Sequence, residues 1–203
     1  MPHGNWWPAN LLVGLTILLP EGGEGQTGVR VHIDTDMGRI TAEIDTARAP
    51  ITAVNFLKYV DMGMYTDGTF YRAVRLDNQP DNEVKIEVIQ GGIARSRRED
   101  RLPPIPMEPT GETGILHLDG VLSMARSGPE TAQGEFFISV GSQPELNQGG
   151  VRNPDGWGFA AFGRVVEGMS VVRAIQSRRT EGQYFPQDER IRIIRIQRTS
   201  PPG

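Results

Sequence analysis

Short segments in which apolar and polar residues alternate recur along this chain from Val29 almost to its end. Val29–Asp34 and Ile40–Ile44 alternate with a period of two residues, and Gly38 between them accommodates a positive φ, so the pair predicts a β-hairpin. The other strand candidates are short segments of the same kind: Thr69–Val74, Lys85–Ile89, Gly120–Ala125, Glu135–Val140, Phe159–Val166 and Ile191–Ile196. The sequence therefore predicts about eight strands.

Only two segments have the spacing of helices. Pro50 opens the first at a position that a helix tolerates, and Gly63 ends it. Its apolar residues recur at i, i+3, i+4 and i+7 and are Ala53, Phe56, Leu57 and Val60. The second is the short segment Met169–Ile175. Because many strands separate the two helices, the pattern excludes the strand–helix alternation of a parallel sheet. It predicts a mainly β fold, a closed eight-stranded antiparallel β-barrel capped by two α-helices.

Glycine and proline are abundant, with 25 Gly and 15 Pro among 203 residues. The glycines have no period of three, which excludes collagen, and the regular apolar segments argue against wholesale disorder. We expect one folded domain over residues 29–199. An apolar segment and linker over 1–28 precede it, and a tail over 200–203 follows.

The apolar run Ala9–Pro20 lies in the N-terminal segment. Its length of about 12 residues is too short to cross a bilayer but suits the core of a secretory signal. Met1–Trp7 carries no Lys or Arg, and no A-x-A cleavage pattern follows. A degenerate export signal and an apolar extension that packs on the domain both remain open. We expect a periplasmic or exported protein without stable membrane insertion, a cytoplasmic one being the alternative.

Charge and composition exclude several function classes. The net charge of −4 provides no long-range attraction to phosphate, so we expect no nucleic-acid partner. The basic run Arg95–Arg101 is interrupted by acids and is either a solvated loop or a docking patch. The chain has no cysteine, its three histidines are scattered, and it lacks G-x-x-x-x-G-K-[ST] and G-x-S-x-G motifs. We expect a monomer with no metal and no cofactor.

Four motifs remain: FYRAV at Phe70–Val74, VIQGG at Val88–Gly92, GVLSMARSGP at Gly120–Pro129 running into GEFFI, and FAAFGRVVEGM at Phe159–Met169. In this order, and with the helix motif at Ala49–Phe56, they resemble the cyclophilin family of peptidyl-prolyl cis–trans isomerases. The resemblance extends from about Val29 to Thr199. It implies the family's barrel with two capping helices, and rotation of X-Pro amides in unfolded or extended peptides in support of protein folding.

Such a rotation requires few functional groups from the protein. The amide barrier is about 18–20 kcal/mol, and uncatalysed exchange takes tens of seconds. No bond is made, so neither a nucleophile nor a metal is required. The reaction needs a hydrogen-bond donor that stabilises the twisted amide in a dry groove, and an apolar pocket for the proline ring.

The resemblance assigns the catalytic guanidinium to Arg72, which follows Phe70 by two residues, so we expect the two side chains on one face of a strand. Gln90 would hold the guanidinium or the substrate backbone; the alternative is a turn-capping role. The resemblance also implies a substrate site made of the main chain of Ala125 and Arg126, of Glu135 at a position usually filled by Gln, and of the pocket residues Val88, Phe137, Leu146 and Phe159. By periodicity alone, these four are more often core residues.

The chain departs from the family pattern in places. Leu76–Lys85 and Gln148–Trp157 are polar, turn-rich insertions. Glu87 replaces a pocket phenylalanine, so it points outward or a loop residue takes the place of the ring. Glu135 is placed to pair with Arg72. These carboxylates favour a second hypothesis, a cyclophilin-fold peptide-binding module or holdase chaperone with little turnover, whereas the retained Arg72 and Gln90 favour the enzyme.

Overall fold

The computed structural model describes residues 1, 3 and 28–199. The apolar run Ala9–Pro20 and the tail 200–203 lie outside the described residues, as does the rest of the predicted N-terminal segment except residues 1, 3 and 28. Within the described part, no helix has the length and apolar character that a bilayer span requires.

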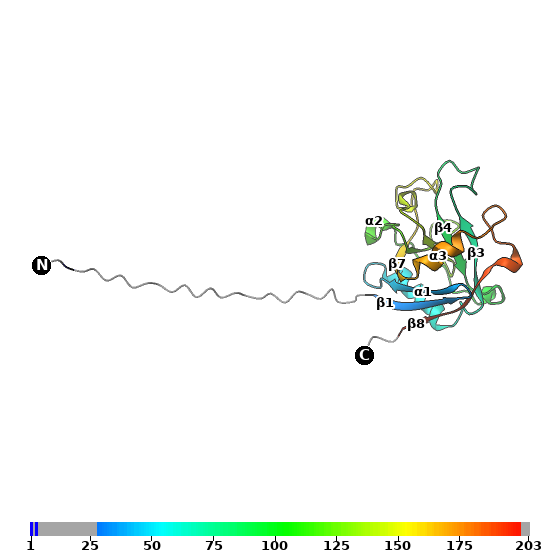
Figure 1. Ribbon diagram of the computed structural model, residues 1–203, viewed down its shortest axis with the longest axis horizontal. Helices are drawn as coiled ribbons and strands as arrows, with labels where there is room; N and C mark the ends of the chain where they lie inside the picture. The colour runs from blue at the N-terminus through cyan, green and yellow to red at the C-terminus, as the bar shows by residue number, and fades with distance from the viewer. Residues whose placement is uncertain (2, 4–27, 200–203) are drawn as a thin grey trace.

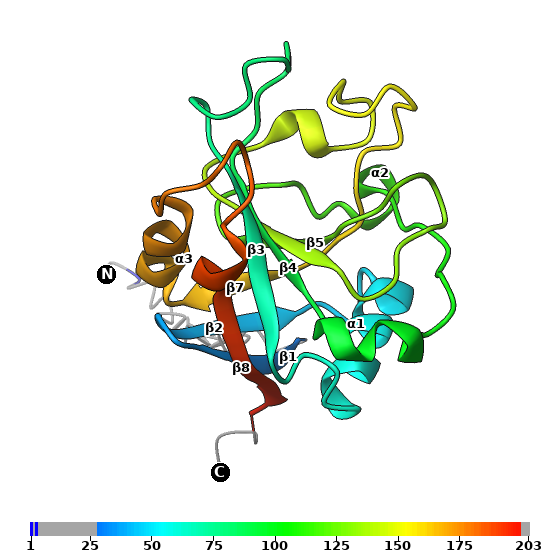
Figure 2. The ribbon, with the colours of Figure 1, turned by 90° about the vertical axis from the view of Figure 1, so that its right-hand side faces the viewer.

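The strands form a closed antiparallel barrel in the order β1-β2-β7-β5-β6-β4-β3-β8, and the predicted fold is confirmed (Figures 1 and 2). The predicted hairpin is the pair β1 and β2. The largest error in a strand start concerns Lys85–Ile89, because the strand begins only at Val88. The strands are β1 Val29–Thr35, β2 Gly38–Ile44, β3 Gly68–Val74, β4 Val88–Gly92, β5 Val121–Met124, β6 Phe136–Ser139, β7 Ala161–Glu167 and β8 Ile191–Arg198.

The two predicted helices lie against this barrel (Figure 1). Helix α1 (Pro50–Asp61) packs on β7 and β8, and α3 (Met169–Gln176) packs on β2, β3 and β4. The predicted apolar face of α1 is buried, and Gly63 follows its end with a φ of 65°. The one-turn helix α2 (Thr110–Thr113) is not predicted, because four residues are too few to show a helical period.

The basic run Arg95–Arg101 is largely exposed, as expected of a solvated segment, but it is not an irregular loop. Arg95–Asp100 forms a 3₁₀ helix without a buried residue, in which Arg97 pairs with Asp100 at 2.8 Å. Arg101 turns inward instead and contacts Glu135. Two of the arginines in this run are therefore paired with carboxylates, one inside the run and one outside it. Two further 3₁₀ turns cover Pro144–Leu146 and Gln187–Glu189.

An aromatic cluster fills the barrel and joins α1 to the strands that carry the site. Phe136 of β6 lies at its centre, fully buried. Its ring centroid is 5.5 Å from those of Phe56 and Tyr65 and 5.8 Å from that of Phe70, with nearly perpendicular ring planes. This edge-to-face arrangement is the favoured one for aromatic pairs. It fixes β3 and β6 relative to each other.

Three loops rise at one end of the barrel, at the top of Figure 2. They connect β3 to β4, β6 to β7 and α3 to β8. The first two contain the predicted insertions Leu76–Lys85 and Gln148–Trp157. Segments far apart in the sequence thus meet beside β3 and β4.

Candidate active site

A β-bulge on β3 turns Arg72 away from the barrel core. Phe70 pairs with Gly91 of β4 but Arg72 pairs with Gln90, so two steps along β3 match one step along β4. Phe70 is fully buried in the aromatic cluster, whereas Arg72 is half-buried and lines a pocket. The prediction that the two side chains share one face is wrong, because the bulge at Tyr71 interrupts the alternation of the strand.

Side-chain amides hold the guanidinium of Arg72. Its Nη1 donates to Oε1 of Gln90 at 2.8 Å, and Nε2 of Gln90 donates to the hydroxyl of Tyr71 at 2.8 Å. On the other side, Nε of Arg72 donates to Oε1 of Gln183 at 3.1 Å, and Nη2 donates to the same oxygen. The ring of Tyr184 faces the guanidinium with its centroid 5.7 Å away. Neutral amide groups orient the guanidinium, so its positive charge is not compensated by these partners.

The sequence motifs do not reveal Gln183. It lies in the loop between α3 and β8, 111 positions beyond Arg72. Only the pairing of β3 with β8 brings this loop to the site, and the main-chain bridge between Arg72 and Tyr184 fixes it there. No local pattern marks such a residue, because its role depends on the closure of the barrel.

Eight of the nine predicted site residues line one pocket of about 240 Å³. The ring centroids of Phe137 and Phe159 are 5.2 Å apart and perpendicular, and both rings pack with a small apolar cluster that is separate from the barrel core. The predicted residues in the pocket are Arg72, Val88, Gln90, Ala125, Arg126, Phe137, Leu146 and Phe159. The remaining lining residues are Ile86, Arg152 and Asn153. The pocket therefore combines apolar side chains with the guanidinium groups of three arginines.

The side chain of Arg126 attaches the insertion Gln148–Trp157 to the pocket. Its Nη atoms donate to both carboxylate oxygens of Asp155 at 2.7 and 2.9 Å, and its Nε donates to the carbonyl of Gly158 at 2.8 Å. The guanidinium also covers the ring of Phe159, 5.2 Å from its centroid. These hydrogen bonds lower the pKa of Asp155 to about 2. The sequence-based prediction for Arg126 concerns only its main chain.

The two unusual carboxylates turn away from this pocket. Glu87 accepts a hydrogen bond from Nε2 of Gln176 in α3 at 3.3 Å, so of the two predicted outcomes it points outward. Ile86 takes the open place in the pocket wall, since it lines the pocket together with Val88. An aliphatic side chain that directly follows the insertion Leu76–Lys85 therefore lines the pocket where the family pattern has an aromatic ring.

Glu135 does not lie among the pocket residues, and its predicted ion pair with Arg72 is wrong. Its Oε1 accepts from Nη2 of Arg101 at 2.8 Å. Its carboxylate fills the space beside Gly92, where an added Cβ would lie 1.6 Å from Oε2. Burial raises the pKa of Glu135, and the contact with Arg101 opposes that rise. Gly92, the second glycine of the Gln-Gly-Gly motif, thus leaves space for the carboxylate of Glu135, which does not line the pocket.

His117 is a buried residue that packs against the pocket residue Phe137 and does not itself line the pocket. Its ring stacks on Phe137 at 5.8 Å between centroids. Nδ1 lies 2.8 Å from Oδ1 of Asn147, and Nε2 lies 2.9 Å from the hydroxyl of Ser123. With Nδ1 donating, Nε2 accepts from the serine, which is the pattern of a neutral imidazole. Burial lowers the pKa of His117 to about 4 from its ordinary 6.5.

This shift predicts a pH-dependent stability. Between about pH 6.5 and pH 4 the unfolded chain binds a proton at His117 and the folded chain does not, so the free energy of unfolding falls as the pH falls. The full loss is about 3 kcal/mol. Urea unfolding at about pH 7 and pH 4.5 measures it, and His117→Gln is expected to show a smaller decrease than the wild-type protein. Equal decreases in both proteins would contradict this account.

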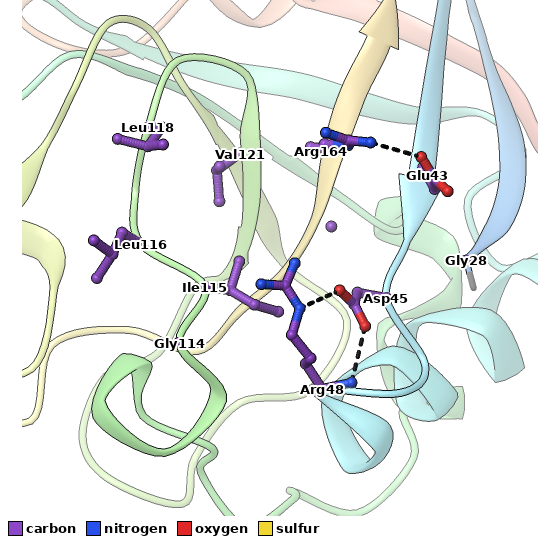
Figure 3. A pocket seen from close by; sticks show the side chains of 11 residues that line it. Gly28, Glu43, Asp45, Arg48, Gly114, Ile115, Leu116, Leu118, Val121 and Arg164 are labelled. Carbon is purple, nitrogen blue, oxygen red and sulfur yellow. Dashed lines mark hydrogen bonds and ion pairs between the residues drawn. The ribbon is translucent and has the colours of Figure 1, made fainter. Parts of the chain in front are cut away.

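A larger pocket of about 410 Å³ lies elsewhere on the barrel (Figure 3). Its charged residues neutralise one another, because Arg48 pairs with Asp45 at 2.6 Å and Arg164 with Glu43 at 3.3 Å. It contains none of the predicted site residues. The smaller pocket at Arg72 is therefore the candidate active site.

Comparisons with known proteins agree with this arrangement. The model of the family described as "Cyclophilin type peptidyl-prolyl cis-trans isomerase/CLD" matches residues 30–198. The chain is 34% identical over 168 residues to the peptidyl-prolyl cis-trans isomerase cyp18 of Streptomyces antibioticus, which covers 82% of this chain and 95% of that protein. It is 31% identical over 159 residues to the peptidyl-prolyl cis-trans isomerase B of Escherichia coli (strain K12), which covers 78% of this chain and 90% of that protein.

Solved structures show the same fold. The crystal structure of a cyclophilin type peptidyl-prolyl cis-trans isomerase from Cryptosporidium parvum aligns with a TM-score of 0.65 at 21% identity, over 86% of this chain and 99% of that chain. The structure of that protein in the presence of the dipeptide Ala-Pro aligns with a TM-score of 0.62 at 21% identity, over 85% and 99% of the two chains.

Proposed function

The chain belongs to the cyclophilin family of peptidyl-prolyl cis–trans isomerases, and we propose that it rotates X-Pro amides at Arg72, in unfolded or extended polypeptides. The observation that carries this proposal is the fixed guanidinium beside an apolar pocket. The pocket is large enough for a proline ring, and its floor is formed by Phe137, Leu146 and Phe159.

The hydrogen bonds of Arg72 leave it able to act on a substrate. A guanidinium has five N–H donors, and three of the donors of Arg72 point to Gln90 and Gln183. The remaining two have no partner among the described residues. They donate to the prolyl amide as it twists, when its nitrogen becomes pyramidal and more basic. Because the guanidinium is already oriented, this stabilisation requires little reorganisation at the moment of rotation.

The geometry removes the main argument for a module that binds without turnover. That hypothesis rests on Glu87 and Glu135 as carboxylates that would disturb the pocket or compete with substrate. Glu87 contacts α3 and Glu135 pairs with Arg101, and among the described residues neither carboxylate forms an ion pair with Arg72. The charge of Arg72 therefore remains available, which favours the enzyme.

A refolding assay tests the proposed function. A protein whose slow refolding phase is limited by X-Pro isomerisation is refolded with catalytic amounts of this protein. We expect the slow phase to accelerate in proportion to the added protein while its amplitude stays unchanged. Retarded refolding, or acceleration only at stoichiometric amounts, would favour the binding module instead.

Gln183 is expected to act as a positioning residue. Because it accepts two of the hydrogen bonds that orient the guanidinium, Gln183→Ala is expected to lower kcat by about tenfold with a smaller effect on KM. Gln183→Glu keeps the acceptor and is expected to recover part of kcat. Gln187→Ala changes an exposed glutamine of the same loop and serves as the matched control. Equal kcat values for Gln183→Ala and Gln187→Ala would contradict this role.

A further inference from the structure

The positive groups of the active-site pocket are mostly without a counterion among the described residues. Three arginines line it, Arg72, Arg126 and Arg152, and no Asp or Glu belongs to the lining. Of these three arginines, only Arg126 has a carboxylate partner among the described residues, Asp155. Arg72 and Arg152 therefore bring two positive charges to one pocket without a counterion in the part of the chain that the structure describes.

Arg152 comes from the insertion Gln148–Trp157 and reaches across the pocket to the other insertion. Its Nη1 donates to Oε1 of Gln79 at 3.1 Å and to the carbonyl of Val84, and its Nη2 donates to Oδ1 of Asn82 at 3.4 Å. All three acceptors are neutral. The inserted loops thus hold Arg152 in place, as the two glutamines hold Arg72.

The two guanidinium groups are close enough to affect each other. Burial lowers the pKa of Arg152, and the charge of Arg72 lowers it further. Arginine nevertheless stays protonated in proteins, so this mutual repulsion persists in the unliganded pocket. An anion bound between the two groups would relieve it.

The neighbouring carboxylates are engaged elsewhere. Glu87 accepts from Gln176 of α3, and Oε2 of Glu145 accepts from the backbone N–H of Val151. Asp81 and Glu83 of the inserted loop are exposed and do not line the pocket. The pocket is therefore positive beside Arg72, where the X-Pro amide is proposed to bind.

We propose that this isomerase selects substrates with a negatively charged side chain next to the proline, and that Arg152 is the residue that determines this preference. The inference rests on the proposed function, since it assumes that the X-Pro amide binds at Arg72. The incoming anion supplies the partner that Arg152 and Arg72 lack. Charge-assisted hydrogen bonds to a guanidinium are strong in a partly buried pocket, and a carboxylate or a phosphate matches its planar donors.

Paired peptides test the proposal. Each pair carries Glu or Gln directly before or directly after the proline, and a third series carries phosphoserine there to separate phosphate from carboxylate. We expect kcat/KM for Glu to exceed that for Gln by about tenfold at low salt in at least one position, and the ratio to approach one at about 1 M salt. Equal values for Glu and Gln at low salt in both positions would overturn the proposal for carboxylates. A preference for phosphoserine alone would assign the site to phosphate.

Three variants test whether Arg152 causes the preference for Glu over Gln next to the proline. Arg152→Gln is expected to reduce the Glu-to-Gln ratio to about one, and Arg152→Lys to restore only part of it, because lysine keeps the charge but loses the planar donors. Arg164→Gln removes the same charge from an exposed position at the other pocket and is expected to leave the ratio unchanged. An unchanged ratio in Arg152→Gln would overturn the role of Arg152.

The same samples separate this proposal from the proposed function. The dissociation constants of the Glu and Gln peptides are measured by NMR titration alongside the exchange rates. Absence of exchange for every peptide would contradict the proposed function, and the ratio of the two dissociation constants would still report the charge preference. Exchange at equal rates with equal affinities would contradict only the charge preference.

Discussion

Replacing Arg72 with alanine is expected to lower kcat/KM for an X-Pro peptide by about 10²- to 10³-fold, the usual effect of removing a preorganised donor. The substitution removes the two N–H groups that are free for the substrate and leaves Gln90 and Gln183 without their donor. Because the side chain is half-buried at the pocket and lies outside the barrel core, the fold should survive. Steady-state kinetics with a chromogenic peptide measures the loss.

Two further variants make this result specific. Arg72→Lys keeps the charge but loses the planar set of donors, so we expect it to recover only a small part of the activity. Arg195→Ala removes an exposed arginine of β8 that contacts Asp34, and we expect wild-type kinetics. Wild-type activity in Arg72→Ala, with its fold intact by circular dichroism, would contradict the catalytic assignment.

Phe136→Ala is expected to have the largest effect on stability, lowering the free energy of unfolding by about 3–5 kcal/mol. Phe136 is fully buried and contacts the rings of Phe56, Tyr65 and Phe70. Its loss opens a cavity between α1 and two strands, which rigid neighbours fill only in part. Denaturant unfolding followed by fluorescence measures the change.

The next residue of β6 provides the matched comparison. Phe137 belongs to the pocket cluster and packs against Phe159, so Phe137→Ala is expected to raise KM strongly and to cost less stability than Phe136→Ala. The two substitutions remove the same atoms on opposite faces of one strand. Similar stability losses with similar kinetics in both variants would contradict the division between core and pocket.

The sequence was sufficient to predict the strands and the two helices, and eight of the nine residues proposed for the site lie around one pocket. Alternation marks a strand such as Ile40–Ile44, and the i, i+3, i+4, i+7 spacing marks α1, because burial of one face imposes these periods. The resemblance to a family then identified Phe137 and Phe159 as pocket residues, which periodicity alone does not distinguish from core residues.

The features that were missed depend on tertiary pairing. The bulge at Tyr71 is a relation between β3 and β4, and it reverses the face of Arg72 relative to Phe70. Gln183 reaches the site only because the barrel closes between β3 and β8. The contact of Glu135 with Arg101 depends on a chain turn 34 positions away. None of these relations leaves a local pattern in the sequence.

NMR exchange spectroscopy on the unmodified protein tests whether it catalyses X-Pro isomerisation, because the method separates rotation of the amide from binding. An Ala-Xaa-Pro peptide is mixed with catalytic amounts of the protein, and exchange cross-peaks between its cis and trans forms are recorded. Uncatalysed exchange takes tens of seconds and gives no such peaks on this timescale. We expect strong cross-peaks with the wild-type protein. Peptide resonances that shift on binding, without any exchange between the two isomers, would contradict it.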